Sequence, residues 1–175
     1  MGVELIPGYV VEPGTRLDRA LLLKFMQRTY HELYPEKKLD HLAKTVDQYL
    51  AGETQLWWVI PELFFETQDD ERTLPMVRRS ITPNAPVGCL WLGNAVDQIC
   101  GDRHTYVFLL YVTPHERHQG IGTALMRRAE NWAAARGDRQ IALQVFHDNE
   151  PAWALYHKLG YVPRSIWMAK PLRQV

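Results

Sequence analysis

The most constraining feature of the sequence is a continuous apolar run followed by a glycine loop and an amphipathic helix. Residues 105–112 read TYVFLLYV with no polar alternation, which predicts a central strand buried on both faces. Apolar residues then recur at helical spacing from Ile121, and Gly137 ends the predicted helix. Residues 141–146 predict the next strand. A strand, helix and strand in this order predict a right-handed crossover between parallel strands.

The rest of the chain predicts further strands and helices around this unit. Residues 62–86 indicate a long loop or hairpin extension, and residues 93–103 a turn-rich connection. Because the other strands are joined by short links, we expect them to pair antiparallel. The remaining predicted elements are a strand at 9–11, a helix from Leu17 to Pro35 capped by Thr15, a helix from Asp40 to Gly52, strands at 56–60 and 87–92, a helix at 151–159 and an extended segment from Tyr161 through Trp167.

These elements predict an α/β fold in one domain spanning residues 1–175. We expect a mixed, mostly antiparallel sheet with helices on both sides and one parallel strand–helix–strand crossover. A chain of 175 residues is long enough to bury a core of this kind.

Charge, cysteines and hydropathy exclude several classes of function. Lys plus Arg and Asp plus Glu both number 20, so no basic excess points to nucleic acid. Cys89 and Cys100 belong to no CxxC pair or Cys/His cluster, so we expect free thiols and no metal site. No apolar run approaches the roughly 20 residues that span a bilayer, and the start is unlike a signal peptide. We therefore expect a cytoplasmic protein without a membrane partner.

The loop between the predicted central strand and its helix reads TPHERHQGIGT, from Thr113 to Thr123. A glycine loop that opens a helix points several backbone N–H groups, and the positive end of the helix, at one spot. Such a spot binds phosphate. The loop lacks both the third glycine of GxGxxG and the GxxxxGK[ST] pattern, which leaves Arg117-x-x-Gly120-x-Gly122. Taken alone, the two glycines are equally consistent with a tight turn.

A second segment, from Asn149 to Tyr161, lies about thirty residues further on. Asn149 and Tyr156 are seven residues apart and so lie on one side of the predicted short helix. The two segments together resemble the GNAT superfamily of acetyl-CoA-dependent N-acetyltransferases. Val112 to Gly122 matches its V-x-P-x-x-[RQ]-x-x-G-x-G/A motif, and the second segment its N-x-x-A-x-x-L-Y-x-K-x-G-[FY] motif. The resemblance covers residues 87–170 well and the first half only in outline.

The resemblance implies a three-layer α/β/α acyl-CoA N-acyltransferase fold, acetyl-CoA as donor co-substrate and no required metal. It places Leu110 and Val112 where the family uses strand backbone groups to hold the pantetheine arm and the acetyl carbonyl. Asn149 corresponds to a side chain that hydrogen-bonds the pantetheine arm. Tyr156 corresponds to the catalytic acid that protonates the departing thiolate. The loop residues that would hold the pyrophosphate are Arg117, His118, Gln119, Gly120, Ile121, Gly122 and Thr123.

The residue that accepts the amine proton is left open. Many family members carry a carboxylate on the strand before the loop, but residues 107–111 contain none. His31, Glu32 and Glu66 are candidates, although a plain surface position is favoured for each. A water-relayed base is a further alternative.

Packing explanations compete with some of these roles. Tyr156 can be a packing residue on an amphipathic helix, and Asn149 can cap that helix while also contacting the cofactor. Trp57, Trp58 and Trp91 can line the acceptor site, although core packing is favoured.

The leading hypothesis is an enzyme that moves acetyl from acetyl-CoA to a primary amine of a small molecule or peptide. A second hypothesis is an acyl-CoA-binding sensor or scaffold without turnover, and a third is a nucleotide-phosphate binding module unrelated to CoA. The predicted edge strands permit a homodimer.

Overall fold

The computed structural model describes residues 2–50, 53–62 and 85–172 of the chain. The chain folds into two compact units, Met1–Gln144 and Val145–Val175. This division does not test the prediction of one domain over residues 1–175, which stays a prediction.

The first unit is built on a six-stranded sheet whose strands follow one another in chain order. All neighbouring strands pair antiparallel except β5 and β6, which are parallel and are joined by the crossing helix α3 (Ile121–Ala135). The predicted mixed sheet with one parallel crossover is therefore confirmed. The strands are β1 (Val3–Ile6), β2 (Tyr9–Pro13), β3 (Gln55–Pro61), β4 (Gly88–Val96), β5 (Arg103–Val112) and β6 (Ile141–Leu143).

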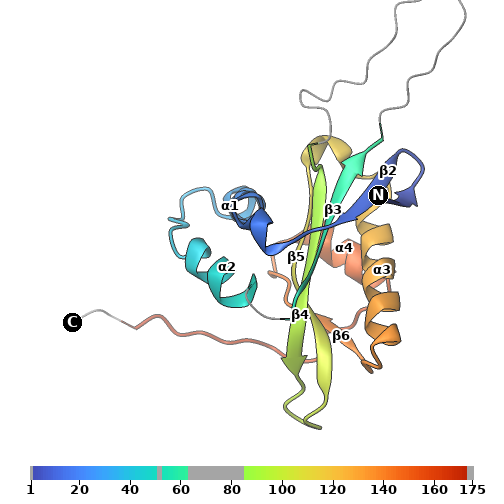
Figure 1. Cartoon of the computed structure of the whole chain (residues 1–175). Coiled ribbons are helices and arrows are strands. Elements are labelled where there is room, and N and C mark those ends of the chain that lie inside the picture. The colour runs from blue at the N-terminus through green and yellow to red at the C-terminus, as the bar shows by residue number, and fades with distance from the viewer. Residues whose placement is uncertain (1, 51–52, 63–84, 173–175) are drawn as a thin grey trace, which may run out of the picture. The chain divides into compact units, whose positions relative to one another are not determined.

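Helices cover both faces of this sheet (Figure 1). Helices α1 (Arg19–Leu33) and α2 (Leu42–Leu50) lie on one face, and α3 lies on the other. A short 3-10 turn, η1 (Arg16–Asp18), leads into α1. Its cap is the predicted Thr15, whose hydroxyl accepts the N–H of Leu17 at 3.2 Å while the Asp18 carboxylate accepts the N–H of Thr15 at 2.7 Å. This reciprocal cap fixes where the first helix begins.

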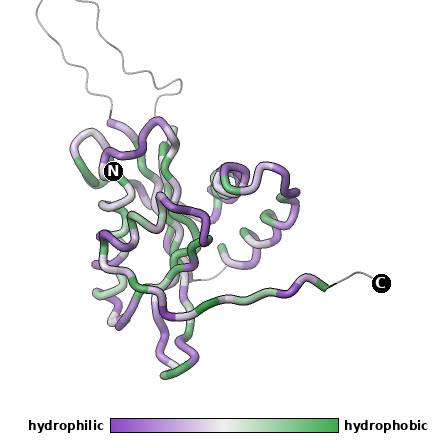
Figure 2. Tube along the Cα trace, turned by 180° about the vertical axis from the view of Figure 1, so that it is seen from behind, coloured by the Kyte–Doolittle hydropathy of each residue, from purple (hydrophilic) through white to green (hydrophobic). Residues whose placement is uncertain are grey.

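The main core lies between the sheet and the α1–α2 pair. Phe25 of α1 packs edge-on against Trp58 and Tyr111, with ring centroids 5.2 and 5.5 Å apart. In Figure 2 the sheet carries most of the apolar stretches, and the helices alternate between polar and apolar positions. The buried members of this cluster are Leu22, Phe25, Met26, Leu42, Val46, Leu50, Leu56, Trp58, Ile60, Cys89, Trp91, Leu109 and Tyr111. Trp57 is buried as well, so all three tryptophans considered for the acceptor site are core residues.

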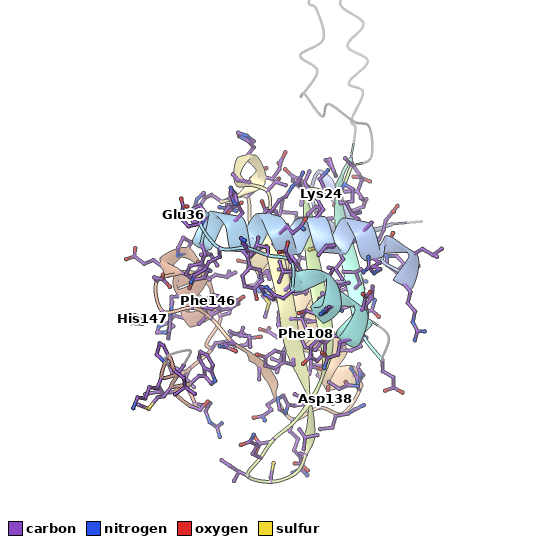
Figure 3. The ribbon with its side chains drawn as sticks, turned by 90° about the vertical axis from the view of Figure 1, so that its left-hand side faces the viewer. Lys24, Glu36, Phe108, Asp138, Phe146 and His147 are labelled. Carbon is purple, nitrogen blue, oxygen red and sulfur yellow. The ribbon has the colours of Figure 1, made fainter. Side chains whose placement is uncertain are left out.

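The β4–β5 hairpin is longer than predicted. Residues 93–103 were expected to be a turn-rich connection, yet β4 continues to Val96 and β5 begins at Arg103. The glycine that suggested a turn, Gly93, has a packing role instead. A Cβ at Gly93 would lie 2.1 Å from the ring of Phe108, which sits at a bulge in the β4–β5 ladder. Figure 3 shows Phe108 beside α2. The ring centroids of Phe108 and Tyr49 are 5.0 Å apart.

Three other boundaries differ from the prediction. Strand β1 was not expected, because its four residues carry no clear alternation of burial. Strand β6 covers Ile141–Leu143 and not residues 141–146. The segment from Tyr161 to Trp167 is irregular backbone in the second unit and joins no sheet. Most of the predicted loop at 62–86 lies outside the described residues.

The first half of β5 is fixed on both edges. Thr105 donates its hydroxyl hydrogen to Asp138 at 2.6 Å, and the Arg103 guanidinium lies 2.8 Å from the same carboxylate. Only 1% of the Asp138 side chain is exposed, and Figure 3 shows this residue at the turn after α3. These contacts hold the end of α3 against the start of β5.

Two further findings apply to the part of the chain that the structure describes. No helix there is long and apolar enough to cross a bilayer, and no group of three or more His, Cys, Asp or Glu is placed to hold a metal ion. Cys89 is buried and Cys100 exposed, both as free thiols.

Candidate functional site

The loop between β5 and α3 turns the chain with two residues in the left-handed region. A short 3-10 turn, η2 (Pro114–Glu116), is followed by His118 with φ 63° and Gly120 with φ 89°. Gly120 is the N-cap of α3 and carries no side-chain cap. The first N–H groups of a helix have no partner within the helix. Where right-handed and left-handed backbone conformations follow one another, the N–H groups form a concave set of donors. The loop thus places N–H donors at the positive end of a fifteen-residue helix, an arrangement that favours anions in general.

The space in front of Gly120 is open. No atom of the described residues lies within 4 Å of the position that a Cβ on Gly120 would take. A glycine is favoured here because its φ of 89° is one that L side chains rarely adopt. The backbone at Gly120 is therefore uncovered on this side.

Strands β5 and β6 separate just before the loop. Their parallel ladder ends at the pair formed by Val107 and Leu143, whereas β5 continues to Val112. Among the described residues, no other strand pairs with the rest of this edge of β5. The end of β5 nearest the loop is thus hydrogen-bonded to β4 alone.

The ladder with β4 decides which backbone groups of β5 remain available. The N–H of Thr113 donates to the carbonyl of Val87 at 2.8 Å, and hydrogen-bonded residues alternate along an antiparallel strand. Tyr111 therefore faces β4, while the N–H and C=O groups of Leu110 and Val112 point to the opposite edge. The two residues named from the family motif are those whose backbone is directed at the gap.

A second set of contacts holds the loop from behind. Tyr9, a buried residue of β2, places its hydroxyl within hydrogen-bond distance of a carboxylate oxygen of Glu116 and of the side-chain oxygen of Gln119, the latter at 2.8 Å. The amide of Gln119 also donates to Glu116 at 3.0 Å. Sequence reasoning missed Tyr9, which lies 107 residues from Glu116, because no local pattern links the two. This network fixes the 3-10 turn that precedes the glycines.

The side chain of Arg117 bonds to the protein itself. Its Nε donates to the carbonyl of Val112 at 2.9 Å, and its terminal nitrogen donates to Glu32 of α1 at 2.6 Å. The guanidinium lies 5.6 Å from the ring centroid of Tyr111. Arg117 thus ties the loop to α1 and to the end of β5, and the loop's phosphate donors are its backbone groups.

The same carboxylate of Glu32 accepts a hydrogen bond from the hydroxyl of Tyr111 at 2.7 Å. Burial, followed by the hydrogen bond and charge of Glu32, raises the pKa of Tyr111 to about 12. Of the three residues considered as proton acceptors, Glu32 is the one that reaches the end of β5. His31 is an exposed residue of α1, and Glu66 lies outside the described residues.

The second unit contains α4 (Glu150–Lys158) with Asn149 as its N-cap. The side-chain oxygen of Asn149 accepts the N–H of Ala152 at 3.3 Å, which confirms the capping role. The indole N–H of Trp153 donates to the carbonyl of Phe146 at 3.1 Å and so holds the entry to the helix. The NH₂ group of the Asn149 side chain takes no part in this cap.

Tyr156 lies two turns along α4. Its ring packs against that of Tyr161 with centroids 5.7 Å apart, and Gly160 ends the helix with φ 88°. Burial raises the pKa of Tyr156 to about 12. The phenol is therefore neutral at every physiological pH and can donate a hydrogen bond.

The predicted site residues divide between the two units. The first unit brings together the loop donors and the outer-edge backbone groups of Leu110 and Val112, of which the Val112 carbonyl already accepts a hydrogen bond from Arg117. Asn149 and Tyr156 belong to the second unit, where they share one helix. These residues offer N–H donors, a phenol and a carboxylate.

Comparisons with known proteins place the chain among acetyltransferases. The sequence profile described as "Acetyltransferase (GNAT) family" matches residues 23–161. An uncharacterised N-acetyltransferase of Methanocaldococcus jannaschii is 33% identical over 86 residues, which cover 46% of this chain and 36% of that protein. A mycothiol acetyltransferase of Beutenbergia cavernae is 26% identical over 153 residues, which cover 87% of this chain and 44% of that protein. The chain thus spans less than half the length of these two relatives.

Solved structures share the fold. A predicted acetyltransferase from Clostridium acetobutylicum, solved with acetyl-CoA, matches with a TM-score of 0.68 over 93% of this chain and 96% of its own, at 18% identity.

Proposed function

The chain belongs to the acetyltransferase (GNAT) family, and we propose that it transfers the acetyl group of acetyl-CoA to a primary amine of a small molecule or peptide. The observation that carries this proposal is the end of β5. There a glycine loop with outward N–H groups and a strand edge without a partner strand occur side by side. A bare phosphate-binding loop would need only the first of these features. Acetyl-CoA needs both, because it has a pyrophosphate and a long arm with amide groups.

The residues present fit this co-substrate. The backbone N–H groups from His118 to Thr123 would hold the pyrophosphate, because that of Arg117 donates to the carbonyl of Pro114 at 3.3 Å. Among the described residues, no other atom crowds the Cβ position of Gly120. The edge groups of Leu110 and Val112 hydrogen-bond the amides of the pantetheine arm in the manner of a missing strand. The NH₂ group of Asn149 is free to bind the same arm while its oxygen caps α4.

Acetyl-CoA supplies the acetyl group as an activated thioester. The protein's task is to hold the thioester carbonyl against a strand N–H, which stabilises the negative charge that develops on its oxygen, typically by a few kcal/mol. The neutral amine nitrogen attacks the carbonyl carbon, the C–N bond forms and the C–S bond breaks. The amine gives up a proton to a base, and the departing sulfur receives one.

Tyr156 is our candidate donor to the sulfur. A pKa of about 12 keeps its phenol protonated, so the hydroxyl is always available as a donor. A free thiol has a pKa of about 8.5, so the phenol is a weaker acid than the thiol that it protonates. Its main contribution is therefore a hydrogen bond to the sulfur as charge develops, and the proton follows as the thiol forms.

The test is release of free thiol from acetyl-CoA in the presence of spermidine, kanamycin, lysine or a tetrapeptide with a free N-terminus. We expect at least one of these amines to give turnover with the acetylated amine as product. Tight binding of acetyl-CoA with no turnover on any amine would contradict the proposal and favour an acyl-CoA-binding sensor or scaffold. Calorimetry with acetyl-CoA and with ATP separates both from a general nucleotide-phosphate module. A cytoplasmic location and a homodimer stay predictions.

A further inference from the structure

We propose that Glu32 is the carboxylate that binds the acceptor's ammonium group and takes its proton before the nitrogen attacks the thioester. The inference rests on the proposed function and adds a residue that the two sequence motifs do not contain. It also states the form in which the acceptor binds, which is a protonated primary amine.

The first argument is position. Strand β5 carries no carboxylate from Val107 to Tyr111, so the strand itself offers no base. Glu32 comes from the last turn of α1, 79 residues earlier, and its Oε1 lies 2.7 Å from the hydroxyl of Tyr111. Tyr111 stands between Leu110 and Val112, whose backbone groups face the gap beside β5. The helix therefore delivers a carboxylate to the part of β5 that faces the co-substrate.

The second argument is capacity. A carboxylate offers about four acceptor positions, and Glu32 uses one for Tyr111 and one for Arg117. The side chain is 36% exposed, so the remaining positions are open to an incoming ligand. A carboxylate that only tied α1 to the loop would need no such opening. An ammonium group, which carries three N–H donors, can use it.

The third argument is the set of charges around the carboxylate. The charged and titratable groups in contact with Glu32 are Tyr111 of β5 and Arg117 of the loop, and Arg28 lies one turn earlier on its own helix. Tyr111 keeps its proton, because its pKa is raised to about 12, and it can act only as a donor here. Arg117 is always a cation. Glu32 is therefore the acceptor of this cluster, because Tyr111 and Arg117 both donate to it.

The proton balance is complete with these groups. The ammonium gives one proton to the Glu32 carboxylate, and the neutral nitrogen forms the C–N bond as the C–S bond breaks. The sulfur leaves as a thiolate that takes a proton and departs as the thiol. Because Glu32 is partly exposed, it returns its proton to solvent before the next cycle.

The experiment compares Glu32→Gln with the native enzyme, using whichever amine of the four-member panel the native enzyme acetylates fastest. At pH 7 we expect kcat/KM for the amine to fall at least 100-fold, while KM for acetyl-CoA changes less than threefold. A free amine with a pKa near 10 gains about tenfold in its neutral form per pH unit. The deficit of the variant should therefore shrink by about tenfold per unit between pH 7 and pH 9.

Matched variants separate this role from a structural one. Glu36→Gln removes the same charge four residues further along, at an exposed position, and should leave kcat/KM within twofold. Glu32→Asp keeps a shorter carboxylate and should recover part of the loss. A Glu32→Gln variant with native kcat/KM, or one whose deficit is the same at every pH, would overturn the proposal while leaving the proposed function intact. Absence of native turnover on the whole panel would overturn both.

Discussion

The two halves of β5 differ in which strands and side chains contact them. From Arg103 to Val107 the strand is paired with β4 on one edge, and from Thr105 to Val107 it is also paired with β6 on the other. Asp138 holds its start from the end of α3. From Phe108 to Val112 it is paired with β4 alone, and its end leads into a loop with outward N–H groups. One strand thus has a closed half and an open half.

This difference indicates which half of β5 contributes to stability and which half we expect to bind a ligand. The closed half is paired on both edges from Thr105 to Val107 and contacts the buried Asp138 carboxylate, so changes there should cost folding free energy. The open half leaves backbone donors and acceptors toward a gap, a state that proteins avoid unless water or a ligand completes it. The open half is therefore the part of the strand that we expect a ligand to complete, and each prediction below tests one half.

The largest expected effect comes from placing a carboxylate in the open half's loop. Gly120→Asp puts a negative side chain where the donors face, on a residue with φ 89°. We expect acetyl-CoA affinity to fall at least 100-fold, about 3 kcal/mol, measured by calorimetry. The matched control is Gly101→Asp, which adds the same charge at φ 75° and also meets no described atom within 4 Å. Equal loss of affinity in both variants would contradict a local role for Gly120.

The next effect separates binding from chemistry in the second unit. Tyr156→Phe removes one hydroxyl and leaves the ring that packs on Tyr161. We expect kcat to fall about 100-fold, the lower end of the roughly 10²- to 10⁴-fold that a positioned proton donor contributes, with KM for acetyl-CoA changed less than threefold. Single-turnover kinetics ensure that the chemical step is measured. Unchanged turnover in that regime would leave Tyr156 as a packing residue only.

The closed half should respond in stability and not in binding. Asp138→Asn removes the charge that Arg103 pairs with and weakens the hydrogen bond from the Thr105 hydroxyl. The Asp138 side chain is 1% exposed. We expect a loss of roughly 1–3 kcal/mol of folding free energy, or a Tm lower by several degrees. The affinity for acetyl-CoA should stay within twofold. A large loss of affinity with unchanged Tm would show that the two halves do not divide as we describe.

The smallest effect is the alkaline loss of stability from buried phenols. The folded protein raises the pKa of Tyr111 and of Tyr156 from 10.0 to about 12. Between these values the unfolded chain has released protons that the folded chain still holds, so stability is full below pH 10 and falls as pH rises toward 12. The urea midpoint should drop between pH 9 and pH 11, and Tyr111→Phe should lessen the drop. A constant midpoint in the native protein would contradict this burial effect.

Features set by local pattern were predictable from the sequence. The apolar run of β5, the glycine loop and the helical spacing of α3 are contiguous, so strand, turn and helix could be placed to within a few residues. The mixed sheet followed, since a strand–helix–strand unit almost always gives parallel neighbours. The family motifs then named Leu110 and Val112, whose part in cofactor binding stays a prediction.

Features set by tertiary contact were not predictable. The prediction that Gly93 lies in a turn was wrong. A glycine is needed there because a Cβ would clash with the ring of Phe108, which lies fifteen residues away on the neighbouring strand. Tyr9 supports the loop from a strand that shares no pattern with it. Glu32 was one candidate among several, because only the packing of α1 on β5 brings it to Tyr111.

The most direct test of the account is amide hydrogen exchange with and without coenzyme A. We predict slower exchange on binding at Leu110, at Val112 and at the first N–H groups of α3 from Ile121 to Thr123, with residues 103–107 unchanged. Protection confined to the closed half of β5, or no protection at the loop at a saturating concentration, would contradict the claim that the open half of β5 is the cofactor site.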